Sequence, residues 1–308
     1  MKSKILSLLN QCLAINPLEK VLVLTDRKMQ AIGKAIYEAC RKINIETALM
    51  IMEARTKDGE ELPEHVEQAM RASDVVIAPT YCSITHTKAT RLACEAGARV
   101  ASMPRVPKYS FIKGGLTADY ERVKKYVEKM FFALQESNFV EVTSPNKTNV
   151  YFSIRRREWH KDTGFILNPG EFGNLPAGEV FIAPIEETIN GKIVFDSFDN
   201  KKKKVKLMVE DGLVKEVEGS SKLKRIFRSL GKKARQICEF GIGCNYKAKV
   251  IGNTIEDEKA LGSIHFGLGN NVGFGGRNNV PLHLDGIIEK PTVKVDNRII
   301  IKDGKWKI

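Results

Sequence analysis

The chain has 308 residues, 43% of them hydrophobic, which is enough apolar side chain for a buried core and about two domains. Its formal charge is +13, but lysine and arginine are spread along the chain instead of gathered into one stripe, so nucleic acid is not predicted as a partner. The one dense basic run, residues 201–204, is typical of a solvated turn.

Short apolar runs and amphipathic stretches alternate through the first half of the chain. Strands are predicted at residues 21–24, 47–52, 74–78 and 98–102, and helices at 5–15, 29–41, 63–72 and 86–96. Strands that are apolar along their whole length and separated by helices are typical of a parallel sheet covered on both faces. We therefore predict a doubly wound parallel α/β domain over residues 1–140. No GxGxxG follows the first strand, so a dinucleotide is not predicted as a ligand.

The pattern changes after a helix predicted at residues 118–135. β-branched runs, glycines and hairpin-like turns, as at Asn190-Gly191 and Asp211-Gly212, dominate the rest of the chain. One further helix is predicted at residues 220–233. We predict that residues 141–308 form a β-rich α+β domain, and that this domain carries the functional site.

The cysteines show no CxxC pair and no short disulfide framework. The sequence also shows no signal peptide and no apolar run long enough to span a bilayer, so we expect a reducing cytoplasm and no membrane partner. Cys238 and Cys244 flank Glu239 and could be soft metal ligands, but they are interpreted as small buried hydrophobic groups. The other cysteines are Cys12, Cys40, Cys82 and Cys94.

Two of the five histidines lie in apolar or glycine-rich segments near the C-terminus. In His283-x-Asp285, an extended strand would point both side chains to the same face, so that they can hold one ion. Alone, such a triplet is more typical of a hydrogen-bonded structural pair than of a metal site. His265, within Ile264-His265-Phe266, adds a second imidazole, and two imidazoles with a carboxylate describe a facial triad or a zinc site.

A single carboxylate, Glu179, opens an apolar strand in the segment Asn-Leu-Pro-Ala-Gly-Glu-Val-Phe-Ile-Ala-Pro, residues 174–184. Burying a carboxylate there is costly unless it is paired or bound to metal. The segment resembles a signature of the thermophilic-type metalloaminopeptidases, the M29 peptidase family. The resemblance covers most of residues 150–300, because further family segments follow in the same order: those of Glu239, Asp257-Glu258-Lys259, His265 and His283-x-Asp285.

The resemblance implies a cocatalytic site with two divalent ions, zinc, cobalt or manganese, held by two glutamates, two histidines, an aspartate and a tyrosine. It implies a homodimeric hydrolase that removes N-terminal residues from small peptides with a metal-activated water. The matching ligands in this sequence are Glu179, Glu239, His265, His283 and Asp285.

One position departs from the family pattern, because no tyrosine follows His265 within the next residues. The relatives of the family include a ring-cleaving dioxygenase acting on 2,5-dihydroxypyridine, which is similar in scaffold and holds one Fe(II) through two histidines and a carboxylate. His265, His283 and Asp285 match such a triad. A third hypothesis is a vestigial site in a metal-binding or small-molecule-binding module. The hydrolase is ranked first, the oxygenase second and the module third.

Two residues are predicted to act on the substrate. Glu239 is a candidate for moving a proton, besides its predicted role as a ligand. Arg277, in a glycine-rich loop between the two histidine motifs, is predicted to bind a substrate carboxylate. The acidic cluster 256–258 is interpreted as a solvated turn, and His86 as an exposed residue at a helix end.

Overall fold

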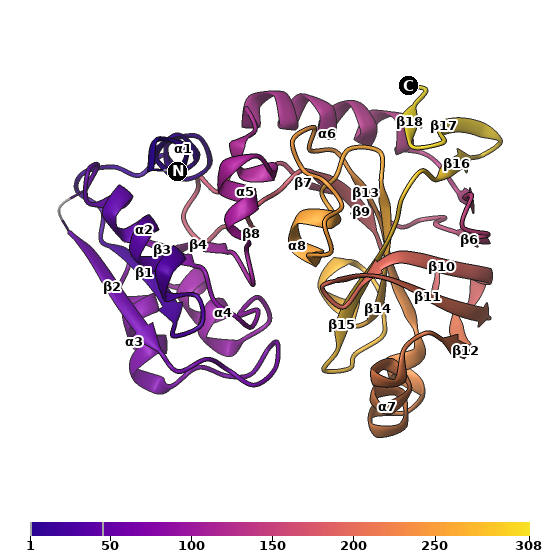
Figure 1. Ribbon diagram of the computed structural model, residues 1–308, viewed down its shortest axis with the longest axis horizontal. Helices are drawn as coiled ribbons and strands as arrows, with labels where there is room; N and C mark the ends of the chain where they lie inside the picture. Colours follow the sequence, from indigo (N-terminus) through magenta and orange to yellow (C-terminus); the bar gives the residue numbers. More distant parts are fainter. Residues whose placement is uncertain (1, 45) are drawn as a thin grey trace. The chain divides into compact units, whose positions relative to one another are not determined.

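The computed structural model describes residues 2–44 and 46–308, and the chain forms two compact units (Figure 1). Unit 1 comprises Met1–Glu121 and Thr163–Ala177, and unit 2 comprises Arg122–Asp162 and Gly178–Ile308. The chain passes from one unit to the other inside α6, Tyr120–Leu134. The predicted domain boundary lies after this helix, near residue 140, because the sequence pattern indicates only where strands replace helices.

Unit 1 is built on a parallel sheet with the strand order β2-β1-β3-β4-β8. β1, β3 and β4 are buried along their whole length, as continuous apolar runs predict for strands covered on both faces. The doubly wound parallel sheet is confirmed. The strands are β1 Val21–Asp26, β2 Thr47–Met52, β3 Val75–Ala78, β4 Arg99–Ser102 and β8 Phe172–Asn174.

The helices of unit 1 bury their apolar residues against these strands. Leu24, Val76 and Val100 of the sheet share one core cluster with Val66 of α3 and Ala89 of α4. This packing follows from the amphipathic spacing of the helices, which presents one apolar stripe to the sheet. The helices are α1 Lys2–Leu8, η1 Leu9–Leu13, α2 Gln30–Cys40, α3 Glu64–Arg71, α4 Lys88–Glu95, α5 Lys108–Ile112 and η2 Gly115–Thr117.

Unit 2 is built on a curled antiparallel sheet with the order β18-β17-β16-β5-β6-β10-β15-β14-β13-β9-β7, and β11 and β12 continue from β10. The β-rich second half is thereby confirmed. The strands are β5 Phe139–Thr143, β6 Asn149–Ser153, β7 His160–Asp162, β9 Glu179–Ile182, β10 Asn190–Phe198, β11 Lys201–Glu210, β12 Leu213–Glu218, β13 Ile237–Gly243, β14 Ile264–Gly269, β15 His283–Ile288, β16 Thr292–Val295, β17 Arg298–Lys302 and β18 Lys305–Trp306.

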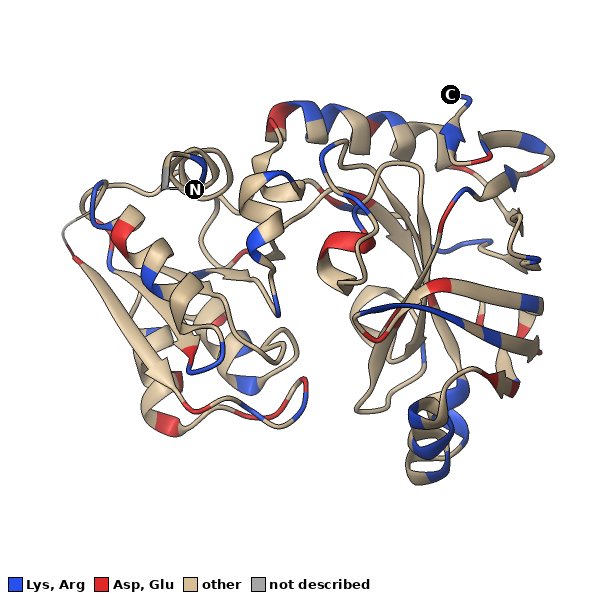
Figure 2. Cartoon of the chain, in the orientation of Figure 1, with Lys and Arg blue, Asp and Glu red and all other residues tan. Residues whose placement is uncertain are grey.

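Few helical segments interrupt this sheet. They are α6, η3 Glu186–Thr188, α7 Ser221–Leu230, η4 Lys232–Arg235, α8 Thr254–Asp257 and η5 Val272–Phe274. The helix predicted at 220–233 ends at Leu230, because Gly231 has a positive φ of 73° that breaks the helical path. In Figure 2 the colours mark basic residues along α7 and acidic residues on α8.

Two predicted turns have different outcomes. Asp211 and Gly212 lie between β11 and β12, as predicted. The hairpin turn at Asn190-Gly191 is wrong, because both residues belong to β10, where Gly191 pairs with Val150 on one side and Val209 on the other. The basic run 201–204 is exposed as predicted, but it begins the strand β11 instead of forming a turn.

The adjacent strands β15, β14, β13, β9 and β7 position the site, because alternate residues point to opposite faces of the sheet. Phe240 of β13 and Phe266 of β14 are fully buried on the core face, where both contact Phe152 edge-on at 5.1 and 5.8 Å between ring centroids. The alternate positions of the same strands place Glu239 and His265 on the other face. We call this other face the site face.

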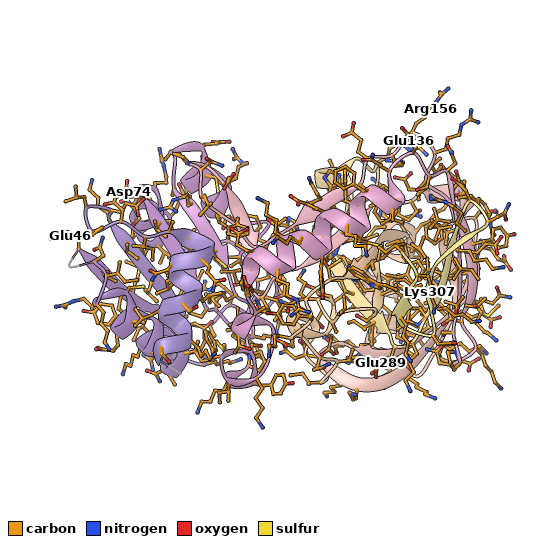
Figure 3. The ribbon with its side chains drawn as sticks, turned by 90° about the horizontal axis from the view of Figure 1, so that it is seen from above. Glu46, Asp74, Glu136, Arg156, Glu289 and Lys307 are labelled. Atoms are coloured by element: carbon orange, nitrogen blue, oxygen red, sulfur yellow. The ribbon has the colours of Figure 1, made fainter. Side chains whose placement is uncertain are left out.

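The exposed side chains of Glu46, Asp74 and Arg156 lie at the outside of their own unit in Figure 3. Among residues 2–44 and 46–308, no helix is both long and apolar enough to cross a bilayer.

Candidate metal centre

The strand register brings two predicted ligands together from strands that are not neighbours. Glu239 of β13 pairs with Gly267 of β14, and Gly267 pairs on its other side with Asp285 of β15. A Cβ atom at Gly267 would lie 2.9 Å from Cβ of Glu239 and 3.0 Å from Oδ1 of Asp285. The missing side chain at Gly267 therefore lets the two carboxylates converge over the central strand.

His283 completes a cluster with these two carboxylates. Its Nε2 lies 3.0 Å from Oε2 of Glu239 and 3.2 Å from Oδ1 of Asp285. One ligand atom from each of the three residues lies within 4.8 Å of the others. Nδ1 of His283 lies 3.1 Å from the backbone carbonyl of Asn270, and an N–H donated to that carbonyl leaves Nε2 to face the carboxylates.

His265 lies on the other side of Glu239. Its Nε2 is 3.4 Å from Oε1 of Glu239 and 3.7 Å from Oε2 of Glu179. The ring lies across β13 at Gly241, where a Cβ atom would be 2.0 Å from Cε1 of His265. A second glycine thus makes room for a second predicted ligand.

Lys259 lies in one of the segments that resemble the family, but its contact with Glu179 was not predicted. Its Nζ lies 2.5 Å from Oε1 of Glu179, 2.9 Å from Oε1 of Glu258 and 3.7 Å from Oδ2 of Asp162. Only 1% of the side chain is exposed. Burial lowers the pKa of Lys259, but the surrounding carboxylates raise it well above its ordinary value. The ammonium group therefore carries a permanent positive charge beside Glu179.

The acidic cluster 256–258 is not a solvated turn, so that prediction is wrong. Glu256 and Asp257 are fully buried, and both belong to the short helix α8. Asp257 accepts hydrogen bonds from the Ser197 hydroxyl and from the backbone N–H groups of residues 251–253. These donors satisfy the carboxylate that burial would otherwise penalise, and they hold the segment that carries Lys259.

The surplus of carboxylates sets the protonation of the histidines. Burial lowers the pKa of His265, but the hydrogen bond with Glu239 and the charge of Glu179 raise it to about 9. Burial also lowers the pKa of His283, and Asp285 raises it well above the ordinary value. Burial raises the pKa of Glu239, while the two imidazoles bring it well below its usual range. The site thus concentrates carboxylates whose charge favours the protonated form of both imidazoles.

The donor set fits a divalent metal ion. Carboxylate oxygens and imidazole nitrogens are ligands of zinc, manganese and ferrous iron. Two buried atoms of the cluster have no hydrogen-bond partner among residues 2–44 and 46–308, namely Nδ1 of His265 and Oε2 of Glu179. Buried polar atoms are normally satisfied, so these atoms indicate a site built for an ion or a ligand.

The structure brings together the matched residues Glu179, Glu239, His265, His283 and Asp285 on the site face. It gives Arg277 other partners. The Arg277 side chain is 68% exposed, and its guanidinium lies 2.7 Å from Oε1 of Glu187. Its role toward a substrate carboxylate stays a prediction.

Tyr246, the tyrosine nearest in sequence to the first histidine motif, packs elsewhere in unit 2. Its ring contacts Tyr126 edge-on at 6.1 Å, and the guanidinium of Arg122 lies 4.3 Å from its ring centroid. Tyr246 therefore does not replace the tyrosine that the M29 pattern has after His265.

Fold and site together define a metal-binding enzyme with the M29 fold. A family model described as 2,5-dihydroxypyridine 5,6-dioxygenase matches residues 5–307, and the chain belongs to this family. The resemblance to the M29 metalloaminopeptidases thus holds for the fold. The family of the chain is that of the ring-cleaving dioxygenase, which the sequence analysis gave as a relative of these peptidases.

Two solved structures share this fold. The structure of 2,5-dihydroxypyridine dioxygenase from Pseudomonas putida KT2440 is 16% identical, with a TM-score of 0.79 over 99% of this chain and 96% of that chain. Wild-type AmpT from Thermus thermophilus is 14% identical, with a TM-score of 0.74 over 100% of this chain and 98% of that chain. No curated protein matches the chain.

Proposed function

We propose that this protein is a single-metal oxygenase that cleaves a dihydroxylated aromatic ring. The observation that carries the proposal is the departure from the two-ion ligand pattern after His265, where no tyrosine follows. The ion pair between Lys259 and Glu179 supports it, because Nζ of Lys259 lies 2.5 Å from Oε1 and only Oε2 of this carboxylate is left for a second ion. Membership of a family described as a dioxygenase supports the same reading.

Electrostatics disfavours a second ion at this position. An ammonium group and a divalent ion bound to one carboxylate would lie a few ångströms apart in a buried site, where like charges repel by several kcal/mol (about 4 kcal/mol for unit charges 4 Å apart at an effective dielectric constant of about 20). Glu239, His283 and Asp285 are then the donors left for one ion, with His265 bonded to Glu239. A small set of imidazole and carboxylate ligands with open positions suits ferrous iron.

When bound, ferrous iron would supply the one-electron chemistry with oxygen that organic side chains lack. The chain's own groups orient the ligands and neutralise charge at the site. The carbonyl of Asn270 fixes the ring of His283, and Gly267 sets the approach of the two carboxylates. Oε1 of Glu239 and Nε2 of His265 lie 3.4 Å apart, so the His265 imidazolium neutralises part of the carboxylate charge beside the ion.

Peptide hydrolysis is the second candidate, and one observation favours it. All five residues matched to the two-ion site of the M29 peptidases lie on the site face. Hydrolysis through two ions would require Glu179 to bind the second ion through Oε2 alone, because Oε1 is paired with Lys259. We therefore rank the hydrolase second.

Assays on the metal-loaded protein separate the two candidates. We would load anaerobically purified protein with Fe(II) and measure oxygen uptake with 2,5-dihydroxypyridine. In parallel, zinc-, cobalt- and manganese-loaded samples would be tested on aminoacyl p-nitroanilides. Oxygen uptake in a fixed ratio to the loss of the ring, absent in His283→Ala, supports the oxygenase. Release of p-nitroaniline without oxygen uptake would refute it.

A further inference from the structure

Aromatic rings border the metal centre on the site face. His160 of β7 stacks on Phe181 of β9, with ring centroids 5.2 Å apart and planes 24° apart. Phe274 of η5 meets both rings edge-on, at 6.4 Å from His160 and 5.6 Å from Phe181. We call His160, Phe181 and Phe274 the aromatic wall.

The aromatic wall is continuous with the metal ligands. Phe181 pairs with Gly241, and Gly241 pairs with His265, so the ring of Phe181 and the imidazole of His265 flank one glycine on the site face. At the other end, Phe274 contacts His283 edge-on, with 6.2 Å between centroids. A ring stacked on the wall therefore lies next to two predicted ligands.

The aromatic wall is not part of the hydrophobic core. Phe152, Phe240 and Phe266 lie on the opposite face of the sheet and are completely buried. The three wall residues are only half-buried. Antiparallel sheets commonly carry polar residues on the face that is not packed into the core. Half-buried apolar rings among charged groups instead are typical of a ligand-binding surface.

Phe274 is held at the tip of a closed loop. The backbone N–H of Asn278 donates to the side-chain oxygen of Asn271 at 2.8 Å, and the N–H of Gly276 donates to the Asn271 carbonyl at 2.9 Å. Asn271 in turn donates to the buried Glu186. At the tip, a Cβ atom at Gly273 or Gly275 would meet nothing within 4 Å. The base of the loop is fixed, and the two glycines that flank Phe274 in the chain lie in open space.

We propose that the aromatic wall binds the planar ring of the substrate by stacking, and that Phe274 sets the specificity for aromatic over aliphatic substrates. This inference rests on the proposed function, because it gives the substrate class of the same site. Offset and edge-to-face ring pairs gain affinity beyond that of the buried apolar area. The imidazole of His160 adds polar edge atoms that suit a ring nitrogen or hydroxyl.

The test measures binding without turnover. The full chain would be loaded with zinc, which is redox-inert, and titrated calorimetrically under argon with 2,5-dihydroxypyridine. We expect Phe274→Leu and Phe181→Leu to weaken binding about three- to tenfold, the loss of one aromatic pair. Phe274→Tyr keeps the ring and should bind as the wild type does. The matched control is Phe132→Leu, which changes a phenylalanine of α6 that is 67% exposed and lies outside the wall.

The outcomes separate this inference from the proposed function. Binding that weakens in Phe274→Leu but not in Phe132→Leu, together with no oxygen uptake in the iron-loaded protein, keeps the aromatic site and refutes the oxygenase. Oxygen uptake with the same KM in the wild type and Phe274→Leu keeps the oxygenase and overturns the role of the wall. Equal binding of leucinamide and 2,5-dihydroxypyridine, or no binding of the latter, would also overturn it.

Discussion

The ammonium nitrogen of Lys259 lies 2.5 Å from Oε1 of Glu179, and both side chains are almost completely buried. This pair joins two motifs that lie 80 residues apart in the sequence, the strand that opens at Glu179 and the segment that follows α8. It turns a carboxylate with the position of a metal ligand into half of an internal ion pair. We propose that this pair limits the site to one metal ion.

Removal of the ammonium group should destabilise the fold strongly. In Lys259→Met, the carboxylates of Glu179, Glu258 and Asp162 lose their buried cation, and we expect a loss of about 3–5 kcal/mol in the free energy of unfolding. Urea denaturation of the metal-free protein measures it. Lys206→Met, which breaks an exposed pair with Glu218, is the control and should cost less than about 1 kcal/mol. Similar losses in both variants would contradict a structural role for the buried pair.

Loss of a predicted ligand should remove the metal and keep the fold. His283→Ala and Asp285→Ala each delete one donor of the cluster, so we expect metal affinity to fall by more than about 100-fold, with little change in the circular dichroism of the metal-free protein. The exposed His86, in unit 1, is the control, and His86→Ala should bind metal normally. Normal metal content in either ligand variant would refute the site assignment.

Gly267 should be intolerant of even a methyl group. In Gly267→Ala, the new Cβ would lie 2.9 Å from Cβ of Glu239 and 3.0 Å from Oδ1 of Asp285, so the carboxylates must separate. We expect weaker metal binding and about 1–3 kcal/mol less stability. Gly273→Ala is a matched control, because its Cβ would meet nothing within 4 Å. Calorimetric titration with metal compares the two, and equal affinities would show that Gly267 does not set the ligand geometry.

Metal affinity should rise with pH. The pKa of His265 is raised to about 9 and that of His283 is also raised, so both imidazoles of the metal-free protein carry a proton at neutral pH. A metal must displace the proton of each imidazole that it binds, so affinity increases about tenfold per pH unit for each proton, up to the pKa of the group. Calorimetry in two buffers of different ionisation enthalpy counts the protons released. A flat affinity between pH 6 and pH 8 would contradict the raised pKa values.

The same shift fixes the sign of the stability change in the metal-free protein. Because the folded-state pKa of His265 lies above its unfolded value of 6.5, its interactions stabilise the fold fully below about pH 6.5. This contribution is lost as the pH rises through about 9.

The features that could be predicted from the sequence are those that follow from local residue patterns. The alternation of strands and helices defined the parallel sheet, and the i, i+2 spacing of His283 and Asp285 placed both side chains on one face. Glu179 could be singled out because a carboxylate in an apolar strand needs a partner. These inferences require only the preferences of neighbouring residues.

What sequence reasoning missed depends on contacts between distant strands. Lys259 follows three acidic residues, which is typical of a solvated turn, and only the pairing of β9 with β13 brings Glu179 to it. The aromatic wall was missed for the same reason, although the alternation Glu179-x-Phe181 already places the phenylalanine on the face of the carboxylate. The returning strand β8 is three residues long, too short for periodicity.

The number of metal ions bound per chain distinguishes the single-metal oxygenase from the two-metal hydrolase. We would purify the chain anaerobically without a histidine tag, saturate it separately with Fe(II) and with zinc, remove loosely bound metal, and measure metal per chain by elemental mass spectrometry. The account predicts one ion per chain in the wild type, because Lys259 holds Glu179. Two ions per wild-type chain would contradict it and favour the two-metal hydrolase.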